Sequence, residues 1–272
     1  KIGRKVAVQC ANLLKPAILE MGGVDPMVVM DDANLERAAK AIVWGSFSNA
    51  GQTCISTERV YIQESIFEDV ISLLKKELLK LSSGPDSLSQ VGAICTYVNL
   101  EKIKRHIKNS GSKEIIEGDC EESSGMFVAP TILVEPAPDS PISTEETFGP
   151  VVCLYRFEDD AEAVSMANKG NYNLSASVFG KNKKRINYFV KCLSAGSISV
   201  NDVQTQYGIA SIPFGGTGKS GIGRRHGKEG LLAYTNHKSV LENIFSLKWE
   251  LWWYDLQRTY YRIAKKFIPW IY

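Results

Sequence analysis

Residues 26–63, PMVVMDDANLERAAKAIVWGSFSNAGQTCISTERVYIQ, contain the pattern from which we predict the fold. Pro26–Met30 is a short apolar run typical of a buried strand, and Arg59–Gln63 is a second one. Between them, Asn34 is a good N-cap residue for a helix over 35–47. A strand, a helix and another strand in this order predict parallel strands with a helix covering one face of the sheet.

The same alternation continues on both sides of this segment. Residues 3–14 favour a helix and Ala17–Glu20 a short strand. We predict further helices at 65–81, 98–109, 159–168 and 182–193, and further strands at 113–117, 131–135, 152–157, 174–179 and 197–200. We therefore expect an α/β fold with a mostly parallel sheet and helices on both faces.

The composition is that of an ordinary globular protein. The chain has 272 residues, of which 44% are hydrophobic and 23% charged, and its formal net charge is +2. These proportions exclude disordered and low-complexity proteins. A net charge this close to zero argues against a non-specific nucleic-acid binder, so we expect no nucleic-acid partner.

The cysteine and histidine residues give no sign of a metal site. The six Cys are dispersed without a CxxC pair, and the three His are not near them in the sequence. We therefore expect no metal. Dispersed Cys indicate a reducing compartment. With neither a signal-peptide pattern at the start nor an apolar run of ~18 residues, we expect a cytoplasmic protein.

Cys54 is the first candidate catalytic residue. It ends the segment NAGQTC (49–54), a polar turn with a glycine after the helix. A nucleophilic Cys needs exposure and a lowered pKa, which the backbone N–H groups of such a turn provide. The alternative is a buried structural Cys that packs like a small hydrophobic residue. Composition alone favours this alternative, and we assign it to the other five Cys.

Carboxylates are the next candidates. Glu20 ends a short apolar strand before Gly22 and Gly23. Open α/β sheets place their sites at the carboxyl ends of strands. Glu20 is therefore a candidate general base if partial burial raises its pKa, and a solvated loop carboxylate is an equally good interpretation. The segment EETFGP (145–150) offers two carboxylates beside an aromatic ring, suited to sugar hydroxyls and a flat ring, or else it is a solvated turn.

A glycine-rich segment, PFGGTGKSGIGR (213–224), contains two misleading motifs. Residues 216–221 match GxGxxG, but Pro213 precedes them instead of a clear strand and no βαβ unit follows. Residues 218–220 resemble the end of a Walker A loop, whose first glycine is replaced here by Pro213. We interpret the segment as a tight loop that allows close backbone approach.

Together these segments resemble the aldehyde dehydrogenase superfamily over residues 1–243. LEMGG (19–23) looks like the family's glutamate motif and FSNAGQTC (47–54) like its cysteine signature. The remaining motifs follow in the family's order: EETFGPV (145–151), NYNLSASVF (171–179), SVN (199–201) and PFGGTGKSGIGR (213–224). Glu20 and Cys54 are 34 residues apart, as in the family.

The resemblance implies a mechanism. Cys54 would attack an aldehyde to give a thiohemiacetal, NAD or NADP would take the hydride, and Glu20 would activate the water that hydrolyses the thioester to a carboxylic acid. Glu146 would hold the nicotinamide ribose and Phe148 would support the nicotinamide ring. Because the coenzyme-A-acylating branch lacks the base, Glu20 favours hydrolysis.

The resemblance also implies residues and partners around this centre. Phe214 and Asn201 would line the substrate side. An aldehyde substrate is implied, and a homo-oligomer in the full-length form. The identity of the aldehyde and the choice between NAD and NADP are not readable from the sequence.

The chain also departs from the family, whose members are nearly twice as long. It starts with Lys1 instead of Met, and the family's GSTxxGR motif ends at Ile2-Gly3-Arg4. We expect the catalytic half of a longer enzyme. Residues 1–20 would end a cofactor-binding domain that is largely missing, and 21–243 would form the catalytic domain. We expect the chain alone to bind NAD(P) weakly.

The remaining residues, 244–272, form a tail of different composition that holds four of the five Trp. Helical spacing connects Trp249, Trp252, Trp253, Leu256, Tyr260, Ile263 and Phe267. From Ser246 on, five basic residues stand against two acidic ones. We predict an amphipathic helix at 249–268 that lies on a membrane surface, which would make the protein peripherally membrane-associated. Packing on another subunit or on the missing domain is the alternative.

Two alternatives to an active dehydrogenase half stay open at this point. The second possibility is a truncated, non-catalytic derivative with a structural or binding role. Residual thiol-esterase activity is the third possibility, because Cys54 and Glu20 suffice in principle for acyl transfer to water.

Overall fold

The structure is a computed structural model. It describes residues 2–86, 88–121, 125–245, 248, 250, 253–254 and 257–267. The chain divides into two compact units, Lys1–Tyr234 and Thr235–Tyr272. The first unit contains the central sheet and the candidate site. The second contains the helix α9 (Gln257–Phe267).

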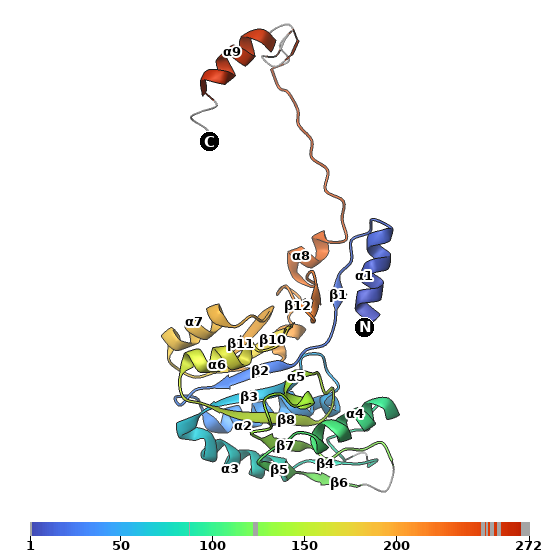
Figure 1. Cartoon of the computed structure of the whole chain (residues 1–272), viewed down its shortest axis with the longest axis vertical. Helices are drawn as coiled ribbons and strands as arrows, with labels where there is room; N and C mark the ends of the chain where they lie inside the picture. Colours follow the sequence, from blue (N-terminus) through green and yellow to red (C-terminus); the bar gives the residue numbers. More distant parts are fainter. Residues whose placement is uncertain are drawn as a thin grey trace. The chain divides into compact units, whose positions relative to one another are not determined.

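A seven-stranded sheet forms the centre of the first unit (Figure 1). In spatial order, its strands are β11 (Ser197–Val200), β10 (Ser175–Phe179), β2 (Asp25–Val29), β3 (Thr57–Gln63), β8 (Val151–Phe157), β7 (Thr131–Val134) and β5 (Glu114–Glu117). Neighbouring strands are parallel, except that β5 is antiparallel to β7. The predicted mostly parallel sheet is therefore confirmed.

Helices cover both faces of this sheet, as predicted. On one face α2 (Leu35–Phe47) packs against α3 (Phe67–Leu78), and on the other α6 (Asp160–Ala167) lies beside α7 (Lys183–Cys192) (Figure 1). The side chain of Asn34 accepts a hydrogen bond from the Arg37 N–H at 3.1 Å, which confirms the predicted N-cap of α2.

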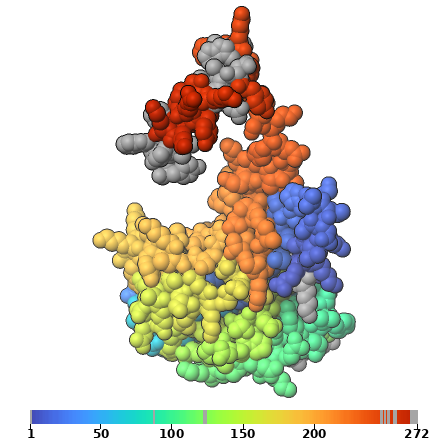
Figure 2. All heavy atoms as spheres, turned by 45° about the horizontal axis from the view of Figure 1, so that its top comes forward, coloured from blue at the N-terminus to red at the C-terminus, as the bar shows by residue number. Residues whose placement is uncertain are grey.

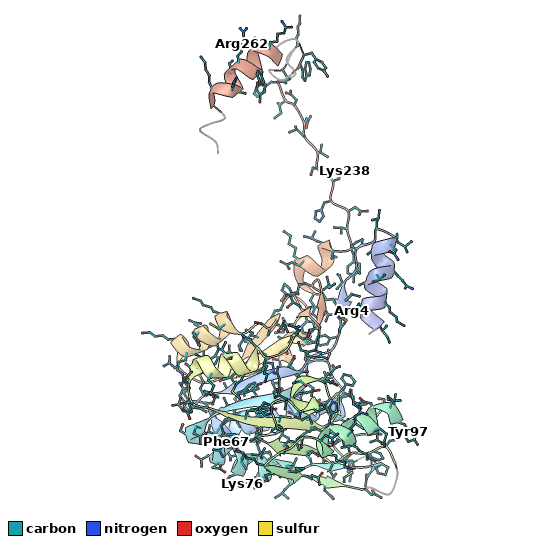
Figure 3. The ribbon with its side chains drawn as sticks, viewed as in Figure 1. Arg4, Phe67, Lys76, Tyr97, Lys238 and Arg262 are labelled. Carbon is teal, nitrogen blue, oxygen red and sulfur yellow. The ribbon has the colours of Figure 1, made fainter. Side chains whose placement is uncertain are left out.

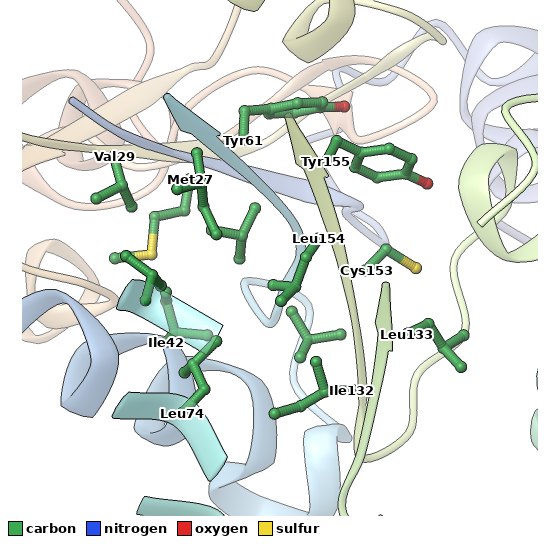
Figure 4. Close-up of a cluster of buried hydrophobic side chains, with 14 of the residues drawn as sticks. Met27, Val29, Ile42, Tyr61, Leu74, Ile132, Leu133, Cys153, Leu154 and Tyr155 are labelled. Atoms are coloured by element: carbon green, nitrogen blue, oxygen red, sulfur yellow. The ribbon is translucent and has the colours of Figure 1, made fainter. Parts of the chain in front are cut away.

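Each helix turns its apolar side toward the sheet. In α3, Phe67 is fully buried and Lys76 is exposed, and Figure 3 labels both. Since side chains on a strand alternate between faces, the sheet contributes to two separate apolar layers. Met27 and Leu154 face α2 and α3, while Tyr61 and Tyr155 stack on the opposite face with ring centroids 5.4 Å apart (Figure 4).

Shorter elements surround this core. They are α1 (Ile2–Asn12), β1 (Leu19–Glu20), β4 (Ser82–Ser83), α4 (Tyr97–Lys108), β6 (Asp119–Cys120), α5 (Pro141–Thr144), β9 (Tyr172–Asn173), β12 (Thr217–Gly218), β13 (Gly221–Ile222) and α8 (Gly227–Leu232). Helix α1 has no buried residue, and Figure 2 shows its atoms, in blue, on the surface of the first unit. The glycine-rich segment predicted as a tight loop forms β12 and β13, which pair with β9 and β1.

The tail is described in part. Helix α9 lies within the range predicted for a helix but begins only at Gln257, and the described residues Trp253 and Tyr254 form a bend and a turn, so the predicted start at 249 was too early. Trp249, Trp252 and Leu256 lie outside the described residues. Among the residues that the structure describes, no helix combines the length and apolar character needed to cross a membrane.

Arg59 is a buried cation that ties three elements together. It lies on β3 and is 3% exposed. Its guanidinium group donates to the carbonyl oxygens of Val24, at 2.8 and 3.2 Å, of Ala167 at 3.2 Å and of Lys169 at 3.1 Å. Because these carbonyls belong to the start of β2 and the end of α6, Arg59 fixes both against β3.

We predict that Arg59→Met lowers the free energy of unfolding by about 3 kcal/mol, because buried carbonyl groups lose their donors. Urea denaturation of both proteins measures the difference. Arg105→Met, on the exposed side of α4, is the matched control and should change the value by less than about 0.5 kcal/mol. A loss for Arg59→Met as small as the control's would contradict this role.

Candidate active site

The candidate residues meet at the amino-terminal edge of the central sheet. Cys54 precedes β3, Glu146 and Phe148 precede β8, and Gly23 precedes β2. Because these three strands are parallel and adjacent, the segments before them meet at one edge. We expected Glu20 to mark the carboxyl edge. Glu20 does end β1, but β1 pairs only with β13 outside the central sheet, so this expectation was wrong.

A cavity of about 360 Å³ opens at this edge. It is lined by Glu20, Met21, Gly22, Cys54, Asn99, Lys102, Glu146 and Phe148. The structure therefore brings together four of the six predicted site residues, those predicted as nucleophile, base and cofactor contacts.

The turn that carries Cys54 is held tightly. Asn49 and Ala50 have positive φ angles of 53° and 55°. The side chain of Gln52 donates to the Ala93 carbonyl at 3.1 Å and accepts from the Cys95 N–H at 2.8 Å. These contacts fix the turn between α2 and β3, and with it the position of the thiol.

The electrostatic surroundings of Cys54 differ from our expectation. Its side chain packs against the small apolar cluster of Ile55, Leu174 and Phe214. This burial raises the pKa of the Cys54 thiol, and the carboxyl groups of Asp25, Glu20 and Glu146 raise it further. A backbone N–H of the turn does lower the pKa of Cys54, as expected, but burial and the acidic side chains outweigh it, so the expected net lowering was wrong.

Glu20 has the properties of a general base. Burial raises its pKa, opposed by the nearby cations Arg225 and Arg224. Its Oε1 atom is buried and has no hydrogen-bond partner among the described residues. A carboxyl group with a free oxygen and a raised pKa is suited to accept a proton from water. From the sequence, Glu20 was a candidate general base only if partial burial raised its pKa, and burial does raise it.

Two glycines separate the carboxyl groups from the cysteine. A Cβ atom on Gly22 would lie 2.1 Å from Glu146 Oε1, and one on Gly23 would lie 2.3 Å from the Cys54 carbonyl oxygen. The Gly23 N–H donates to Glu146 Oε1 at 3.2 Å. At Gly23 the contact is with backbone, so a side chain there would displace the turn that carries Cys54. At Gly22 the contacted atoms are the end of the Glu146 side chain, so a side chain there would displace the carboxyl group from its present position.

Helix α4 closes the cavity from the side. Asn99 donates from Nδ2 to the Phe148 carbonyl at 2.7 Å, and Lys102 lines the cavity one turn further along. Burial raises the pKa of Glu146, while the Gly23 N–H and Lys102 act in the opposite direction. The cavity is thus lined by the carboxyl group of Glu146, the cation of Lys102 and the aromatic ring of Phe148.

The remaining two predicted residues do not line the cavity. Phe214 is 1% exposed and lies behind Cys54, where its ring packs edge-on against Tyr207 at 5.0 Å. Asn201 follows β11 at the carboxyl edge of the sheet, where its side chain binds the N–H and the carbonyl of Gly180 at 2.9 and 2.8 Å. The substrate-lining role expected for Asn201 is wrong, because it lies at the opposite edge of the sheet and both ends of its amide are occupied.

Several residues of the site were missed by sequence reasoning. Asn99 and Lys102 are polar residues at helical spacing, which gives no chemical signal without the cavity. Asp25 and Glu58 are 4% and 2% exposed. Burial raises the pKa of Asp25 to about 7, opposed by hydrogen bonds that its carboxylate accepts from the Ser175 hydroxyl and N–H. For Asp25 and Glu58, the only sequence signal was their position at or next to the start of a strand.

The other cysteines fit the structural interpretation unevenly. Cys153 on β8 is 1% exposed, and burial raises its pKa to about 12. Cys95, by contrast, is exposed, so the expectation of packing does not hold for it. Among the described residues, no group of His, Cys, Asp and Glu side chains is placed to hold a metal ion.

Comparison with known proteins identifies the family. The sequence model of the aldehyde dehydrogenase family matches residues 1–240, and the chain belongs to this family. A 4,4'-diapolycopene aldehyde oxidase of Methylomonas sp is 34% identical over 99% of this chain and 51% of its own length. An NADP-dependent succinate-semialdehyde dehydrogenase of Escherichia coli is 33% identical over 88% of this chain and 50% of its own length.

Solved structures agree with this assignment. The crystal structure of an NAD-dependent aldehyde dehydrogenase from Sinorhizobium meliloti matches with a TM-score of 0.83 and 32% identity, over 90% of this chain and 51% of that one. The relatives thus include one enzyme named as NAD-dependent and one named as NADP-dependent. The chain spans about half the length of the curated relatives it matches.

We predict that alkylation of Cys54 by iodoacetamide follows a pH profile whose midpoint lies above that of a cysteine peptide, ~8.5. The reason is the burial and the carboxyl groups that raise its pKa. Glu20→Gln removes one of these charges and should move the midpoint to lower pH. Residue-resolved mass spectrometry measures the rates.

Glu117→Gln, on the exposed side of β5, is the control and should leave the midpoint in place. A midpoint at or below that of the peptide, or an upward shift in Glu20→Gln, would contradict the electrostatic account.

Proposed function

We propose that this chain is the catalytic half of an NAD(P)-dependent aldehyde dehydrogenase, which oxidises an aldehyde to a carboxylic acid. The observation that carries the proposal is that Cys54 and Glu20 line the same cavity. The Oε1 atom of Glu20 is buried and has no hydrogen-bond partner among the described residues, so it is free to accept a proton. The family assignment supports it, as do the named dehydrogenases among the relatives.

The proposed reaction begins at Cys54. Its sulfur attacks the aldehyde carbonyl, and the thiol proton passes to the carbonyl oxygen, which gives a thiohemiacetal. A nicotinamide ring held at this cavity would supply the hydride acceptor, and the hydroxyl proton would be released to water. The product on Cys54 is a thioester, a reactive acyl group on a good leaving thiolate.

Hydrolysis then returns the enzyme to its starting state. Glu20 takes a proton from a water molecule, and the resulting hydroxide attacks the thioester carbonyl. The C–S bond breaks, the carboxylic acid leaves, and the proton held by Glu20 returns to the Cys54 thiolate. The raised pKa of Glu20 suits this step, because a more basic carboxylate removes the proton more readily.

The cavity fits the nicotinamide–ribose end of the cofactor. The Glu146 carboxylate would accept hydrogen bonds from ribose hydroxyls, and Lys102 would donate to one. Phe148 would support the flat ring. In this proposal the residues of the cavity contact the nicotinamide–ribose end alone, and the adenosine end is held elsewhere.

The substrate proposed is a lipophilic aldehyde. The side chains packed around Cys54 are apolar, namely the buried cluster of Ile55, Leu174 and Phe214. The Methylomonas relative, whose name gives a diapolycopene aldehyde as substrate, matches 99% of this chain. The succinate-semialdehyde relative matches 88%.

We predict that the chain alone hydrolyses a nitrophenyl ester slowly, because acyl transfer to Cys54 and hydrolysis by Glu20 need no cofactor. Cys54→Ala should abolish the activity. Glu20→Gln should slow turnover by roughly a hundredfold, the usual contribution of a general base. Release of nitrophenolate measures both.

Cys95→Ala is the matched control, since Cys95 is exposed and does not line the cavity. Its turnover should equal that of the unchanged chain. Turnover that survives Cys54→Ala would contradict the assignment, and a chain without any turnover would favour the non-catalytic alternative.

A second proposal concerns the tail: α9 binds a membrane surface, so the protein is peripherally membrane-associated. With ~100° per residue, the four basic residues of α9 fall within an arc of about 100°. They are Arg258, Arg262, Lys265 and Lys266, of which Figure 3 labels Arg262. Tyr260, which is 43% exposed, lies on the opposite side, and Ile263, which is 49% exposed, lies about 60° beyond Lys266. Such segregation is typical of helices at anionic lipid surfaces.

We predict that the chain floats with vesicles of phosphatidylcholine and phosphatidylserine and that deletion of 246–272 abolishes this. Arg258→Gln and Arg262→Gln should each weaken binding about fivefold, because a basic residue near an anionic surface contributes ~1 kcal/mol. Lys104→Gln, on exposed α4, is the control. Flotation that persists after the deletion would contradict the proposal. The homo-oligomer implied by the family stays a prediction.

A further inference from the structure

Glu58 is a buried acid that the proposed mechanism does not use. It lies on β3, and its side chain points toward the segment between α5 and β8. Its two carboxylate oxygens accept from the Thr147 N–H at 2.9 and 3.0 Å, and Oε1 also accepts from the Phe148 N–H at 2.9 Å. Among the described residues, no basic side chain forms an ion pair with it.

The segment that Glu58 holds includes two residues of the cavity. Glu146 directly precedes Thr147, and Phe148 follows it. Phe148 has a φ of 55°, a left-handed conformation that is unfavourable for an aromatic residue and persists only where the surroundings enforce it. The segment therefore needs partners that fix its backbone.

Helix α4 supplies some of these partners but not all. Asn99 donates to the Phe148 carbonyl at 2.7 Å, and the His106 ring nitrogen Nδ1 lies 3.2 Å from the Thr147 hydroxyl. Neither accepts a backbone N–H. The only contacts shown for the Thr147 and Phe148 N–H groups in the described part of the chain are those with Glu58. This makes the carboxyl group the acceptor on which the backbone conformation depends.

We propose that Glu58 is a positioning residue that fixes the backbone of Thr147 and Phe148, so that the Glu146 carboxylate and the Phe148 ring face the cavity beside Cys54. The proposal rests on the proposed function in one respect, namely that this cavity receives the nicotinamide–ribose end of a cofactor. The positioning itself follows from the contacts.

The energetics support mutual dependence between the acid and the segment. Burial raises the pKa of Glu58 to about 8, against the effect of the Thr147 and Phe148 N–H groups. Glu146 raises it further and Lys102 lowers it. Since a buried carboxylate without donors is strongly unfavourable, the two N–H groups offset part of its burial. The Glu58 carboxyl group in turn supplies the acceptor for both N–H groups, and Thr147 is 1% exposed.

Backbone amide hydrogen exchange on the full chain tests the positioning. In Glu58→Ala, the amides of Thr147 and Phe148 should exchange at least about tenfold faster, because they lose their acceptor. Glu58→Gln keeps one acceptor oxygen and should give a smaller increase. Amides of α6 should not change, which separates a local effect from unfolding.

Glu64→Gln is the matched control, because it makes the same chemical change at an exposed position just after β3. It should leave exchange at Thr147 and Phe148 unaltered. If Glu58→Ala does not fold, Glu58→Gln alone decides the result. Unchanged exchange in the Glu58 variant that folds would overturn the proposal.

Binding of nicotinamide mononucleotide, measured by calorimetry, gives the functional readout. Glu58→Ala should weaken its affinity about tenfold, with partial rescue in Glu58→Gln. Faster exchange with unchanged affinity would overturn the link between the segment and the cavity. Because the chain alone is expected to bind weakly, the titration uses concentrated nucleotide. If the unchanged chain shows no binding even then but exchange responds as expected, the positioning is supported and the proposed cofactor site is wrong.

Discussion

The site depends on the absence of side chains at Gly22 and Gly23. A Cβ on the first would meet the Glu146 carboxylate at 2.1 Å, and one on the second would meet the Cys54 carbonyl at 2.3 Å. These two glycines let the segments before β2, β3 and β8 converge at the amino edge of the parallel sheet. A side chain at Gly22 would displace the Glu146 carboxyl group, and one at Gly23 would displace the Cys54 carbonyl. The remaining features of the site, such as the Gly23 N–H that holds Glu146, follow from this close packing.

Convergence at this edge also explains the electrostatics. Glu20, Asp25, Glu58 and Glu146 all lie in or near the same partly buried region, and burial raises the pKa of each. A thiol among them is held in its neutral form, so Cys54 depends on its surroundings for activation. The same burial makes Glu20 a better base. The same burial therefore makes the Cys54 thiol less acidic and the carboxylate of Glu20, the residue proposed to hydrolyse the thioester, more basic. A cation in the cavity would favour the Cys54 thiolate. The positively charged nicotinamide ring that is proposed to lie beside Phe148 would have this effect.

Local patterns predicted the elements of the fold well, because each strand and helix has its own periodicity and caps. Asn34 at the start of α2 and the apolar run before it are examples. The motif order also indicated Cys54, Glu20, Glu146 and Phe148 as site residues. Sequence could not predict which edge of the sheet holds the site, because β1 looks like a sheet strand and instead pairs with β13. It also misplaced Asn201, whose position beside Gly180 depends on the pairing of β10 with β11. The buried Glu58 gave no signal, since its partners are backbone N–H groups that are 89 and 90 residues away.

The proposed mechanism requires that Cys54 forms an acyl intermediate and that Glu20 promotes its hydrolysis. Both steps can be followed by intact-protein and peptide mass spectrometry of the Glu20→Gln chain, quenched soon after addition of a nitrophenyl ester. We expect one acyl group to accumulate per chain, on the peptide that carries Cys54. The unchanged chain should show much less of this adduct, because Glu20 promotes its hydrolysis. An acyl group on another residue, or equal amounts of adduct in both proteins, would rule out the proposed roles of Cys54 and Glu20.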